Sequence, residues 1–431
     1  MADAQVRPIR IALIGAGTVG SKVASLMLEQ AEDLEARSGA PLVLVGVGVK
    51  DASKARPGIP KDLITADVPG LLAKDIDIVV EVMGGIEPAR THILDAMSRG
   101  ISVVTANKEL LARDGATLAA AAEKNNVDLY YEASVAGAIP LLRPLRESLV
   151  GDRVKKILGI VNGTTNYILT KMDETGASFK DALQEAQKLG YAEADPTADV
   201  EGNDAAAKAA ILAQLAFHTR VTIDDVFVEG ITKVSANDVL AAKEMGYVIK
   251  LLAISERLDD DSVVVRVHPA MIPRSHPLAS VREAFNAVFV VAEAAGSLMF
   301  YGQGAGGAPT ASAVLGDVVA VARNKMSGNR GPGESIYADL EIKPIGQAQT
   351  SYYISLQVAD KPGVLAQISQ KIADHNVSIE TVRQDGLVND AQLVIKTHKA
   401  LEKDLAKTLD ELKNLDSVKE ISDYMRVEGE N

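Results

Sequence analysis

The fold of the N-terminal part is decided by the stretch Ile9-Arg10-Ile11-Ala12-Leu13-Ile14-Gly15-Ala16-Gly17-Thr18-Val19-Gly20. Its first six residues are mostly β-branched or apolar and predict a strand, and an amphipathic helix follows to about Ala31 or beyond. A G-x-G-x-x-G motif alone is weak evidence, but between a strand and a helix it indicates a dinucleotide site. The glycines permit a tight turn and let a pyrophosphate approach the helix N-terminus. The alternative is a glycine-rich turn without a ligand. The residues expected to contact the cofactor are Gly15, Gly17, Thr18, Val19 and Gly20.

The second predicted strand, residues 42–49, ends at Lys50-Asp51. In enzymes that use NAD, an acidic residue at this place binds the ribose hydroxyls, whereas a basic residue suits the 2′-phosphate of NADP. Lys50 comes first, so the sequence favours NADP(H). Asp51 beside it keeps NAD(H) open.

Three further strands are predicted at 76–82, 102–105 and 127–131, with helices at 88–98 and 109–124. This alternation predicts a parallel sheet, and we expect residues 1–149 to form a Rossmann domain. Side chains at the carboxyl ends of parallel strands face the ligand crevice. The candidates there are Thr105, Asn107, Lys108 and Glu132. Lys108 could also be an ordinary surface lysine at the start of a helix.

Carboxylates surround one lysine between Gly190 and Leu212. Asp195-Pro196 and Gly202 predict a loop, and Asn203 is a plausible N-cap for the alanine-rich helix that follows. Asp204 and Lys208 are four residues apart and therefore share a helix face. The small side chains indicate that this helix packs closely against another element. Because a nucleotide-binding signature precedes it in the chain, we predict a proton-handling lysine near a polar substrate. An acidic surface loop before a solvated helix is the alternative. The loop carboxylates include Glu193 and Asp199.

Residues 150–301 are expected to form a mixed α/β domain for substrate binding and dimerisation. A strand at 154–161 ends in Asn162-Gly163-Thr164-Thr165-Asn166, whose short polar side chains suit a small polar ligand. A turn that caps a helix at 167–172 is equally consistent. Strands at 262–268, 287–291 and 298–301 are predicted to share one sheet, with helices between them.

A second glycine-rich loop, residues 301–309, contains Gly304 and Gly306 and opens a helix at 310–323. It is either a flexible hinge or a backbone surface against the nicotinamide and the substrate. Residues 302–323 are expected to return to the Rossmann domain. Residues 324–349, which contain several Gly, Ser and Pro, are expected to be a linker.

Residues 350–431 show the order βαββαβ of a ferredoxin-like module. The predicted strands are 351–358, 377–381, 392–396 and 418–425, and the helices are 365–375 and 401–412. The segment Asp360-Lys361-Pro362-Gly363-Val364-Leu365 resembles the start of an ACT domain, an amino-acid-sensing module. That resemblance implies an effector site between paired modules. The site residues it implies are Asp360, Gly363, Leu365 and Ser378.

The composition restricts the class of protein. The 431 residues carry 45 Lys and Arg against 58 Asp and Glu, a formal net charge of −13, which argues against nucleic acids and anionic membranes as partners. There is no cysteine, so disulfides, thiolate metal sites and thioester catalysis are excluded. No apolar run predicts a membrane span and no signal-peptide pattern precedes the first strand, so we expect a cytoplasmic protein.

The chain from about residue 9 to residue 425 resembles homoserine dehydrogenase of the long bacterial type with a C-terminal ACT domain. The motifs that carry this resemblance are residues 15–20, Thr105-Ala106-Asn107-Lys108, 163–169, 189–196 and Asp204-Ala205-Ala206-Ala207-Lys208. It implies the NAD(P)-dependent interconversion of L-homoserine and L-aspartate 4-semialdehyde, with reduction as the physiological direction. The implied context is threonine, methionine and isoleucine biosynthesis, with L-threonine as effector and a homodimer or tetramer as the assembly.

The resemblance also implies residue roles. Lys208 is the proton donor and acceptor, Lys108 is the second lysine, and Glu193 and Asp204 bind substrate, with Asp199 and Thr164 as further candidates. A structural Na⁺ is implied at main-chain oxygens of Glu132, Val135, Gly137 and Ile139. Glu109 stands where some members have another lysine. Two alternatives stay open: another dehydrogenase of an amino-acid-derived semialdehyde, and a non-catalytic amino-acid sensor.

Overall fold

The computed structural model describes residues 6–386 and 390–430. The chain divides into two compact units, each of which is described by itself. Unit 1 comprises Met1–Val154, Ala210–Ile223 and Val291–Asp339, and unit 2 comprises Lys155–Ala209, Asp224–Val290 and Leu340–Asn431.

Unit 1 is built on a parallel sheet in the order β3-β2-β1-β4-β5-β6, with β1 at the centre as in doubly wound folds. The sheet confirms the predicted Rossmann arrangement. The strands predicted at 102–105 and 127–131 begin and end within two residues of those bounds. The strands are β1 (Ile9–Ile14), β2 (Leu42–Gly48), β3 (Ile64–Thr65), β4 (Ile78–Glu81), β5 (Ser102–Thr105) and β6 (Leu129–Tyr130).

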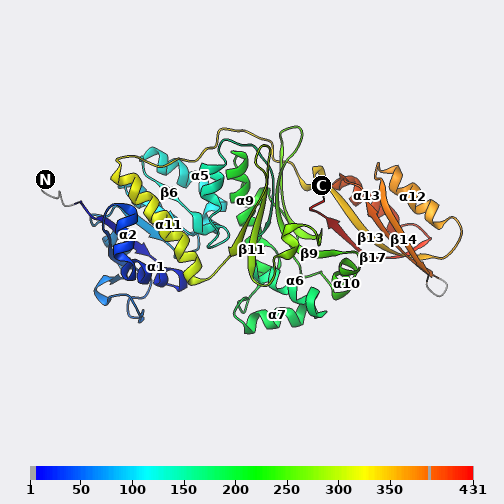
Figure 1. The fold of residues 1–431 in the computed structure, drawn as a ribbon, viewed down its shortest axis with the longest axis horizontal. Helices are drawn as coiled ribbons and strands as arrows, with labels where there is room; N and C mark the ends of the chain where they lie inside the picture. The colour runs from blue at the N-terminus through cyan, green and yellow to red at the C-terminus, as the bar shows by residue number, and fades with distance from the viewer. Residues whose placement is uncertain (1–5, 387–389, 431) are drawn as a thin grey trace. The chain divides into compact units, whose positions relative to one another are not determined.

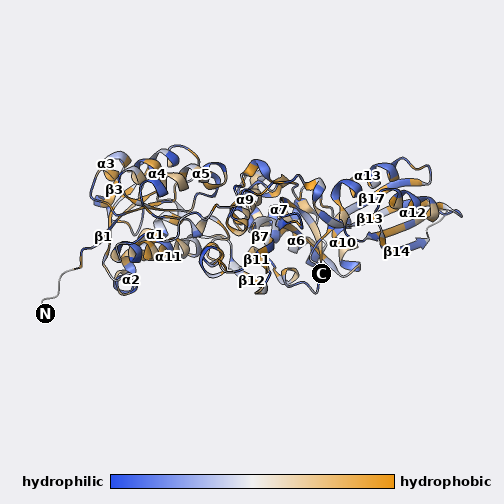
Figure 2. Ribbon diagram, turned by 90° about the horizontal axis from the view of Figure 1, so that it is seen from above, coloured by the Kyte–Doolittle hydropathy of each residue, from blue (hydrophilic) through white to orange (hydrophobic). Residues whose placement is uncertain are grey.

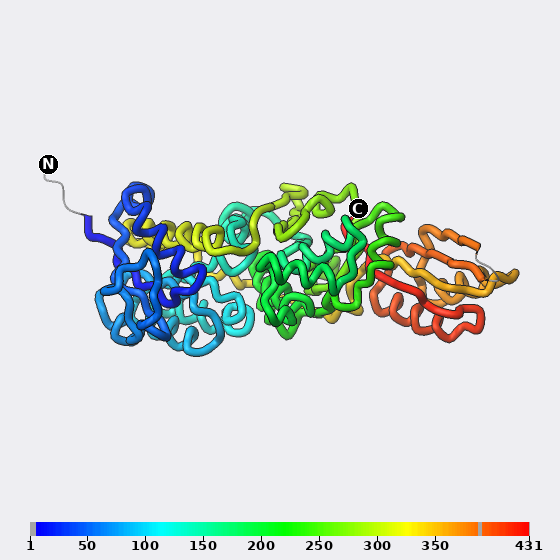
Figure 3. The backbone as a smooth tube through the Cα atoms, turned by 90° about the horizontal axis from the view of Figure 1, so that it is seen from below, coloured from blue at the N-terminus to red at the C-terminus, as the bar shows by residue number. Residues whose placement is uncertain are grey.

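Helices cover both faces of this sheet. Figure 2 shows α3 (Val68–Leu72), α4 (Ala89–Ser98) and α5 (Lys108–Lys124) on one side and α1 (Thr18–Glu29), α2 (Ala31–Ser38) and α11 (Gly307–Met326) on the other. The late helix α11 lies beside the N-terminal segments of the chain (Figure 3). Its Val314 and Val318 are fully buried in the same apolar core as Ile11 and Val23. Residues some 300 positions apart in the chain therefore form one core.

The central part of unit 2 has the strand order β11-β7-β9-β10. No strand was predicted for the segment that forms β9, because its mostly apolar sequence shows no strict alternation. The expectation of helices between the later strands was wrong: a 3-10 turn at Pro277–Ser280 precedes β11, and three residues separate β11 from β12. The strands of this region are β7 (Val154–Ile160), β8 (Phe227–Val228), β9 (Tyr247–Arg257), β10 (Val263–Pro273) and β11 (Phe285–Ala292). The helices are α6 (Gly163–Thr175), α7 (Phe179–Lys188), α8 (Thr197–Val200), α9 (Asn203–Phe217) and α10 (Ala236–Glu244). The boundary between the two units falls within α9, and β12 (Gly296–Gln303) belongs to unit 1.

The C-terminal module has the predicted βαββαβ order, and its strands pair antiparallel as β17-β13-β15-β14. Both helices lie on one face of this sheet (Figure 1). This is the ferredoxin-like arrangement, and it confirms the prediction. The elements are β13 (Gln349–Ala359), α12 (Val364–Asp374), β14 (Ile379–Gly386), β15 (Asp390–Thr397), β16 (Ala400–Leu401), α13 (Glu402–Lys413) and β17 (Val418–Val427).

The module is joined to the rest of unit 2 by its last strand. β17 pairs in parallel with β10 through Ala270 and Arg426, and the C-terminal end of the chain lies beside this part of the unit in Figure 3. The guanidinium of Arg266, 1% exposed, binds Glu256 at 2.8 Å and Glu428 at 2.9 Å. A buried charge without its partner is strongly destabilising. Removal of the module would therefore disturb β10.

Candidate active site

The first glycine loop has the close packing that a dinucleotide site needs. Gly15 has φ +101°, and a Cβ there would lie 2.8 Å from the backbone nitrogen of Met83. A Cβ on Gly20 would lie 2.0 Å from the carbonyl oxygen of Gly15. At Gly17 an added Cβ meets no described atom within 4 Å, so this position leaves room for a ligand.

The second glycine loop packs against the first one. A Cβ on Gly307 would lie 3.1 Å from the carbonyl oxygen of Thr18, at the start of α1. Gly306 has φ +122° and is the N-cap of α11, and the carbonyl oxygen of Gly304 would be 2.5 Å from a Cβ on Gly137. The second loop is therefore packed against the start of α1 and the turn at Gly137, and its contact with the cofactor or the substrate stays a prediction.

The end of β2 carries several cations. Lys50 is exposed, and the carboxylate of Asp51 accepts hydrogen bonds from the backbone and hydroxyl of Ser53, which lower the pKa of Asp51. Arg56 donates to the carbonyl oxygens of Asp51 and Lys54, each at 2.9 Å. Its buried Nε has no hydrogen-bond partner among the described residues. The sequence analysis missed Arg56, although a basic residue six positions after Lys50 was a usable signal.

The end of β5 is organised by buried polar groups. Thr105 donates its hydroxyl to Glu81 at 2.6 Å, and its oxygen accepts the backbone N–H of Asn107 at 3.0 Å. Asn107 caps α5 through Leu110 and donates to the carbonyl oxygen of Gly85 at 2.7 Å. Lys108 is half-buried as the first residue of α5. The Thr105 hydroxyl is therefore engaged in holding β4 and β5 together.

The segment predicted to bind a cation is a strained turn. Ala136 has φ +57° and Gly137 has φ +54°. The Glu132 carboxylate accepts backbone N–H groups of Leu141, Leu142 and Arg143, so its side chain fixes the turn. Among the described residues, no loop or turn backbone N–H donates to the main-chain oxygens of Val135, Gly137 and Ile139. Such oxygens suit a hard cation.

In unit 2, three of the candidate substrate residues, Lys208, Asp204 and Asp199, form one hydrogen-bonded group. The ammonium of Lys208 lies 2.7 Å from Asp204 Oδ2 and 2.6 Å from the carbonyl oxygen of Val161. Asn162 Nδ2 lies 2.8 Å from Asp204 Oδ2 and 2.6 Å from Asp199 Oδ1. Lys208 and Asn162 are buried. The expectation of a solvated helix in the alternative is therefore wrong, although the loop before the helix does expose acidic residues, among them Glu193 and Glu201.

Two local expectations need correction. α6 begins at Gly163 with Asn162 as its N-cap, so the polar run predicted as a turn before residue 167 is helical. α9 begins at Asn203, and Gly202 precedes it, so Asn203 is not the cap. Thr164 donates to the carbonyl oxygen of Tyr191 at 2.6 Å, which holds the loop after α7.

Glu193 is placed differently from the other substrate candidates. It is exposed on that same loop, and its backbone carbonyl accepts a bond from Gln187 at 3.1 Å. Its carboxylate forms no ion pair or hydrogen bond with any of the described residues. The structure therefore groups Lys208, Asp204 and Asp199 and leaves Glu193 at the surface of unit 2.

Lys250 is a buried lysine that the sequence analysis missed. Its ammonium lies 2.6 Å from the carbonyl oxygen of Val281 and 2.8 Å from Asn166 Oδ1. Burial lowers the pKa of Lys250 to about 7. A lysine inside the apolar run of β9 was the available signal. Lys250 links β9 to α6 and to the loop before β11.

The candidate effector residues are all at the surface of the ACT module but at two ends of its sheet: Asp360, Gly363 and Leu365 lie at the end of β13 and the start of α12, whereas Ser378 precedes β14, whose first residues are level with the start of β13. Asp360, Gly363, Leu365 and Ser378 are exposed, and Gly363 has φ +89° as the N-cap of α12. The backbone carbonyl of Ser378 accepts the N–H of His398 at 2.8 Å. A surface position is what an effector site between paired modules requires.

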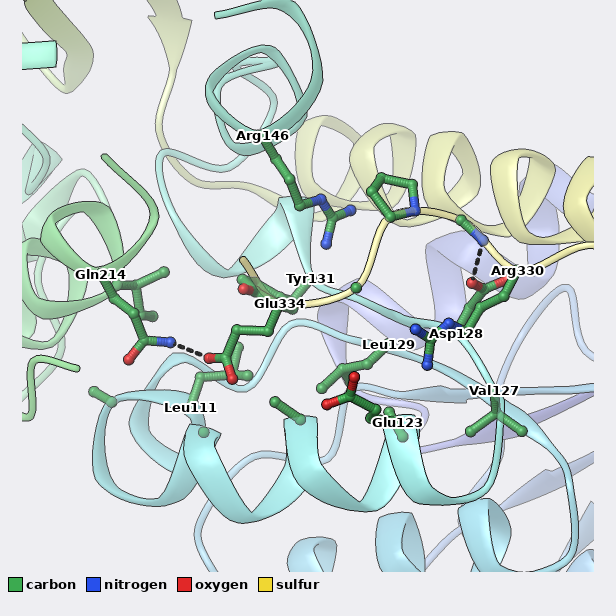
Figure 4. A pocket seen from close by; sticks show the side chains of 18 of the residues that line it. Leu111, Glu123, Val127, Asp128, Leu129, Tyr131, Arg146, Gln214, Arg330 and Glu334 are labelled. Atoms are coloured by element: carbon green, nitrogen blue, oxygen red, sulfur yellow. Dashed lines mark hydrogen bonds between the residues drawn. The ribbon is translucent and has the colours of Figure 1, made fainter. Parts of the chain in front are cut away.

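A separate pocket in unit 1 is lined in part by residues 330–334, which belong to the predicted linker (Figure 4). The backbone nitrogen of Gly331 donates to Asp128 at 2.8 Å, and Glu334 pairs with Gln214. This segment is therefore packed against α5 and β6.

Among the described residues, none of the helices has an apolar stretch of the length that a membrane span requires.

Comparisons with known proteins decide the family. The family described as "Homoserine dehydrogenase" matches residues 140–319, "Homoserine dehydrogenase, NAD binding domain" matches 15–132, and "ACT domain" matches 352–417. The homoserine dehydrogenase of Mycobacterium tuberculosis is 57% identical over 98% of both chains. The chain belongs to the homoserine dehydrogenase family. A homoserine dehydrogenase structure from Thiobacillus denitrificans, 40% identical, has a TM-score of 0.92 over 98% of both chains.

As a homoserine dehydrogenase, the protein is an NAD(P)-dependent oxidoreductase with a C-terminal ACT domain, as the sequence analysis predicted. A hyperthermophilic archaeal homoserine dehydrogenase in complex with NADPH is 26% identical, with a TM-score of 0.63 over 76% of this chain and 100% of that chain. The two alternatives, a different semialdehyde dehydrogenase and a non-catalytic sensor, are set aside by these matches.

Proposed function

We propose that Lys208 carries the proton of the homoserine dehydrogenase reaction. The observation that supports this role is the buried Lys208–Asp204 pair, in which the ammonium is held by two oxygens. A nicotinamide cofactor held at Gly15, Gly17 and Gly20 would supply or accept the hydride when bound. As an ammonium paired with Asp204, Lys208 is in the form that donates a proton to the aldehyde oxygen during reduction. In the reverse direction the neutral amine of Lys208 takes the hydroxyl proton and becomes the ammonium.

The remaining substrate roles follow from charge. Homoserine brings an ammonium, a carboxylate and a hydroxyl. Asp199 shares Asn162 with Asp204, so it supplies a carboxylate for the substrate ammonium in the same group. Glu193 supplies a further carboxylate from the surface loop, and Thr164 orders that loop. Lys108 is proposed as the second lysine of the reaction.

We propose NADP(H) as the preferred cofactor. Lys50, Lys54 and Arg56 place three cations after β2, and Asp51 is engaged by Ser53. A cationic loop favours a 2′-phosphate over a ribose hydroxyl. The glycine cradle at Gly15, Gly17 and Gly20 fits a dinucleotide, and the archaeal relative in complex with NADPH supports the same preference.

Binding of a structural Na⁺ at Glu132, Val135, Gly137 and Ile139 is also proposed. Support comes from the strained turn and from the carbonyl oxygens of Val135, Gly137 and Ile139, to which no loop or turn backbone N–H of the described residues donates. The cation would hold the turn against the second glycine loop. The cytoplasmic location predicted from the sequence stays a prediction.

Feedback control by L-threonine through the ACT domain completes the proposal. The exposed positions of Asp360, Gly363, Leu365 and Ser378 suit an effector held between two copies of the module, so we propose a homodimer or tetramer. For allostery, threonine must bind one global state better than another.

The test uses the full chain, because deletion of residues 350–431 would leave the buried Arg266 without Glu428. Initial rates of NADPH and NADH oxidation are measured with L-aspartate 4-semialdehyde, and threonine is titrated against wild type and Leu365→Ala. Leu365 is 40% exposed, so its truncation should leave basal activity intact and weaken inhibition. Leu240→Ala, 55% exposed on α10, is the matched control. Equal threonine sensitivity in all three proteins would exclude Leu365 from the effector site.

A further inference from the structure

Residues 229–231 of unit 2 contact, on one side, the end of α8, the helix that carries Asp199. The backbone nitrogen of Ile231 donates to the carbonyl oxygen of Val200 at 2.8 Å. A Cβ on Gly230 would lie 2.3 Å from that same oxygen and 2.5 Å from Glu201 Cα, so only glycine allows this approach. The segment and the end of α8 are therefore in direct backbone contact.

The same segment contacts the last strand of the ACT domain on its other side. Glu229 Oε2 lies 2.7 Å from Arg426 Nη1 on β17. Arg426 also donates two hydrogen bonds to Glu402, at 2.7 and 2.9 Å, and its guanidinium lies over the rings of Phe227 and Tyr352. The backbone nitrogen of Glu229 donates to Val267 on β10 at 2.8 Å. Glu229 is thus held by both β10 and β17.

The contact at Val200 is one residue away from Asp199, whose carboxylate is proposed to bind the substrate. Asp199 precedes Val200 and shares the amide of Asn162 with Asp204, at 2.6 and 2.8 Å. Gly202, with φ +86°, follows on the same loop, and a Cβ there would lie 3.1 Å from Val228. A shift of residues 229–231 would therefore move Asp199 relative to Asp204 and Lys208.

We propose that Glu229 and Arg426 are positioning residues that place the carboxylate of Asp199 relative to Asp204 and Lys208. We propose also that their ion pair couples the ACT domain to homoserine binding. The regulatory half rests on the proposed control by threonine, and the positioning half rests on the proposed substrate role of Asp199. Contacts between packed backbone segments transmit displacement because a close-packed interior has little space to absorb it. An effector that changes the position of β17 acts on Glu229, then on Val200, and then on Asp199.

The test is the steady-state kinetics of Glu229→Ala and Glu229→Gln, with melting temperatures measured for each. Loss of the ion pair should raise KM for L-homoserine by roughly fivefold, the lower end of typical coupling. KM for NADP⁺ should stay within about twofold, because the candidate cofactor residues belong to unit 1. Threonine inhibition should weaken in parallel. Glu229→Gln keeps the size of the side chain and removes only the charge, so it serves if Glu229→Ala fails to fold.

Glu411→Ala is the matched control. Glu411 forms an ion pair with Lys371 at 3.1 Å between the ACT helices, and its 42% exposure is close to the 39% of Glu229. This variant should leave both KM values and the threonine response unchanged. The proposal is overturned if folded Glu229→Gln behaves as wild type, or if Glu411→Ala shows the same losses. If threonine does not inhibit wild type, the control by threonine fails, while the KM comparison still decides the positioning role.

Discussion

Lys208 and Asp204 lie one helical turn apart on α9, with their charged atoms 2.7 Å apart and both side chains less than one-tenth exposed. Buried ion pairs are costly to desolvate, so this one is poor evidence for stability and better evidence for a site. Asn162 donates a hydrogen bond to Asp204 Oδ2, the same oxygen that Lys208 contacts.

The first prediction concerns Lys208. Lys208→Ala should lower kcat on the order of 10²–10⁴-fold, the usual loss for a general acid–base group. The dissociation constant for NADPH should change little, because the candidate cofactor residues are in unit 1. Stopped-flow fluorescence gives the binding constant and initial rates give kcat. A variant with near-normal turnover at its optimum pH would remove Lys208 from the chemistry.

A pair of glycine variants separates fold from cofactor binding. Gly20→Ala should lower the melting temperature of the cofactor-free protein, because its Cβ would lie 2.0 Å from Gly15 oxygen. Overpacking costs about 1–3 kcal/mol, which corresponds to several degrees. Gly17→Ala should leave that temperature unchanged and weaken NADPH binding, because its Cβ occupies ligand space. Calorimetry with and without NADPH distinguishes the two, and equal behaviour of both variants would refute this assignment.

Lys50 should discriminate between the two cofactors. Lys50→Ala is expected to weaken NADP(H) binding more than NAD(H) binding by roughly 1–3 kcal/mol, the range for a charge-assisted hydrogen bond. Lys74→Ala, another exposed lysine of unit 1, is the control. Comparison of kcat/KM for the two cofactors provides the measurement. An equal loss for both would show that Lys50 only shapes the end of β2.

Lys250 should make stability depend on pH. Its pKa is lowered from 10.5 to about 7 in the folded protein. Between these values the unfolded chain binds a proton that the folded chain does not, so the free energy of unfolding rises with pH. The melting temperature of wild type, relative to Lys250→Met, should therefore increase from pH 7 to pH 10. Lys188→Met, at an exposed position, should track wild type. A constant difference between wild type and Lys250→Met would contradict the assignment.

The glycine loop and the ACT order were predictable because their signals are local. Gly15, Gly17 and Gly20 act through the backbone geometry of one turn, and Asp360 to Leu365 mark one strand-to-helix loop. The pairing of Asp204 with Lys208 was predictable from helical spacing. β9 was missed because a mostly apolar segment without alternation is ambiguous between a buried strand and a buried helix.

The sequence by itself determined the parallel nucleotide-binding unit, the ferredoxin-like module and the residue types of the site, since each depends on residues close together in the chain. Only the tertiary structure decided that Asn162 joins Asp199 to Asp204, that Lys250 is buried between α6 and β9, and that β17 pairs with β10. These contacts join residues 37 to more than 150 positions apart. The partner of a buried polar group is set by which surfaces pack together, and local sequence carries no record of that choice.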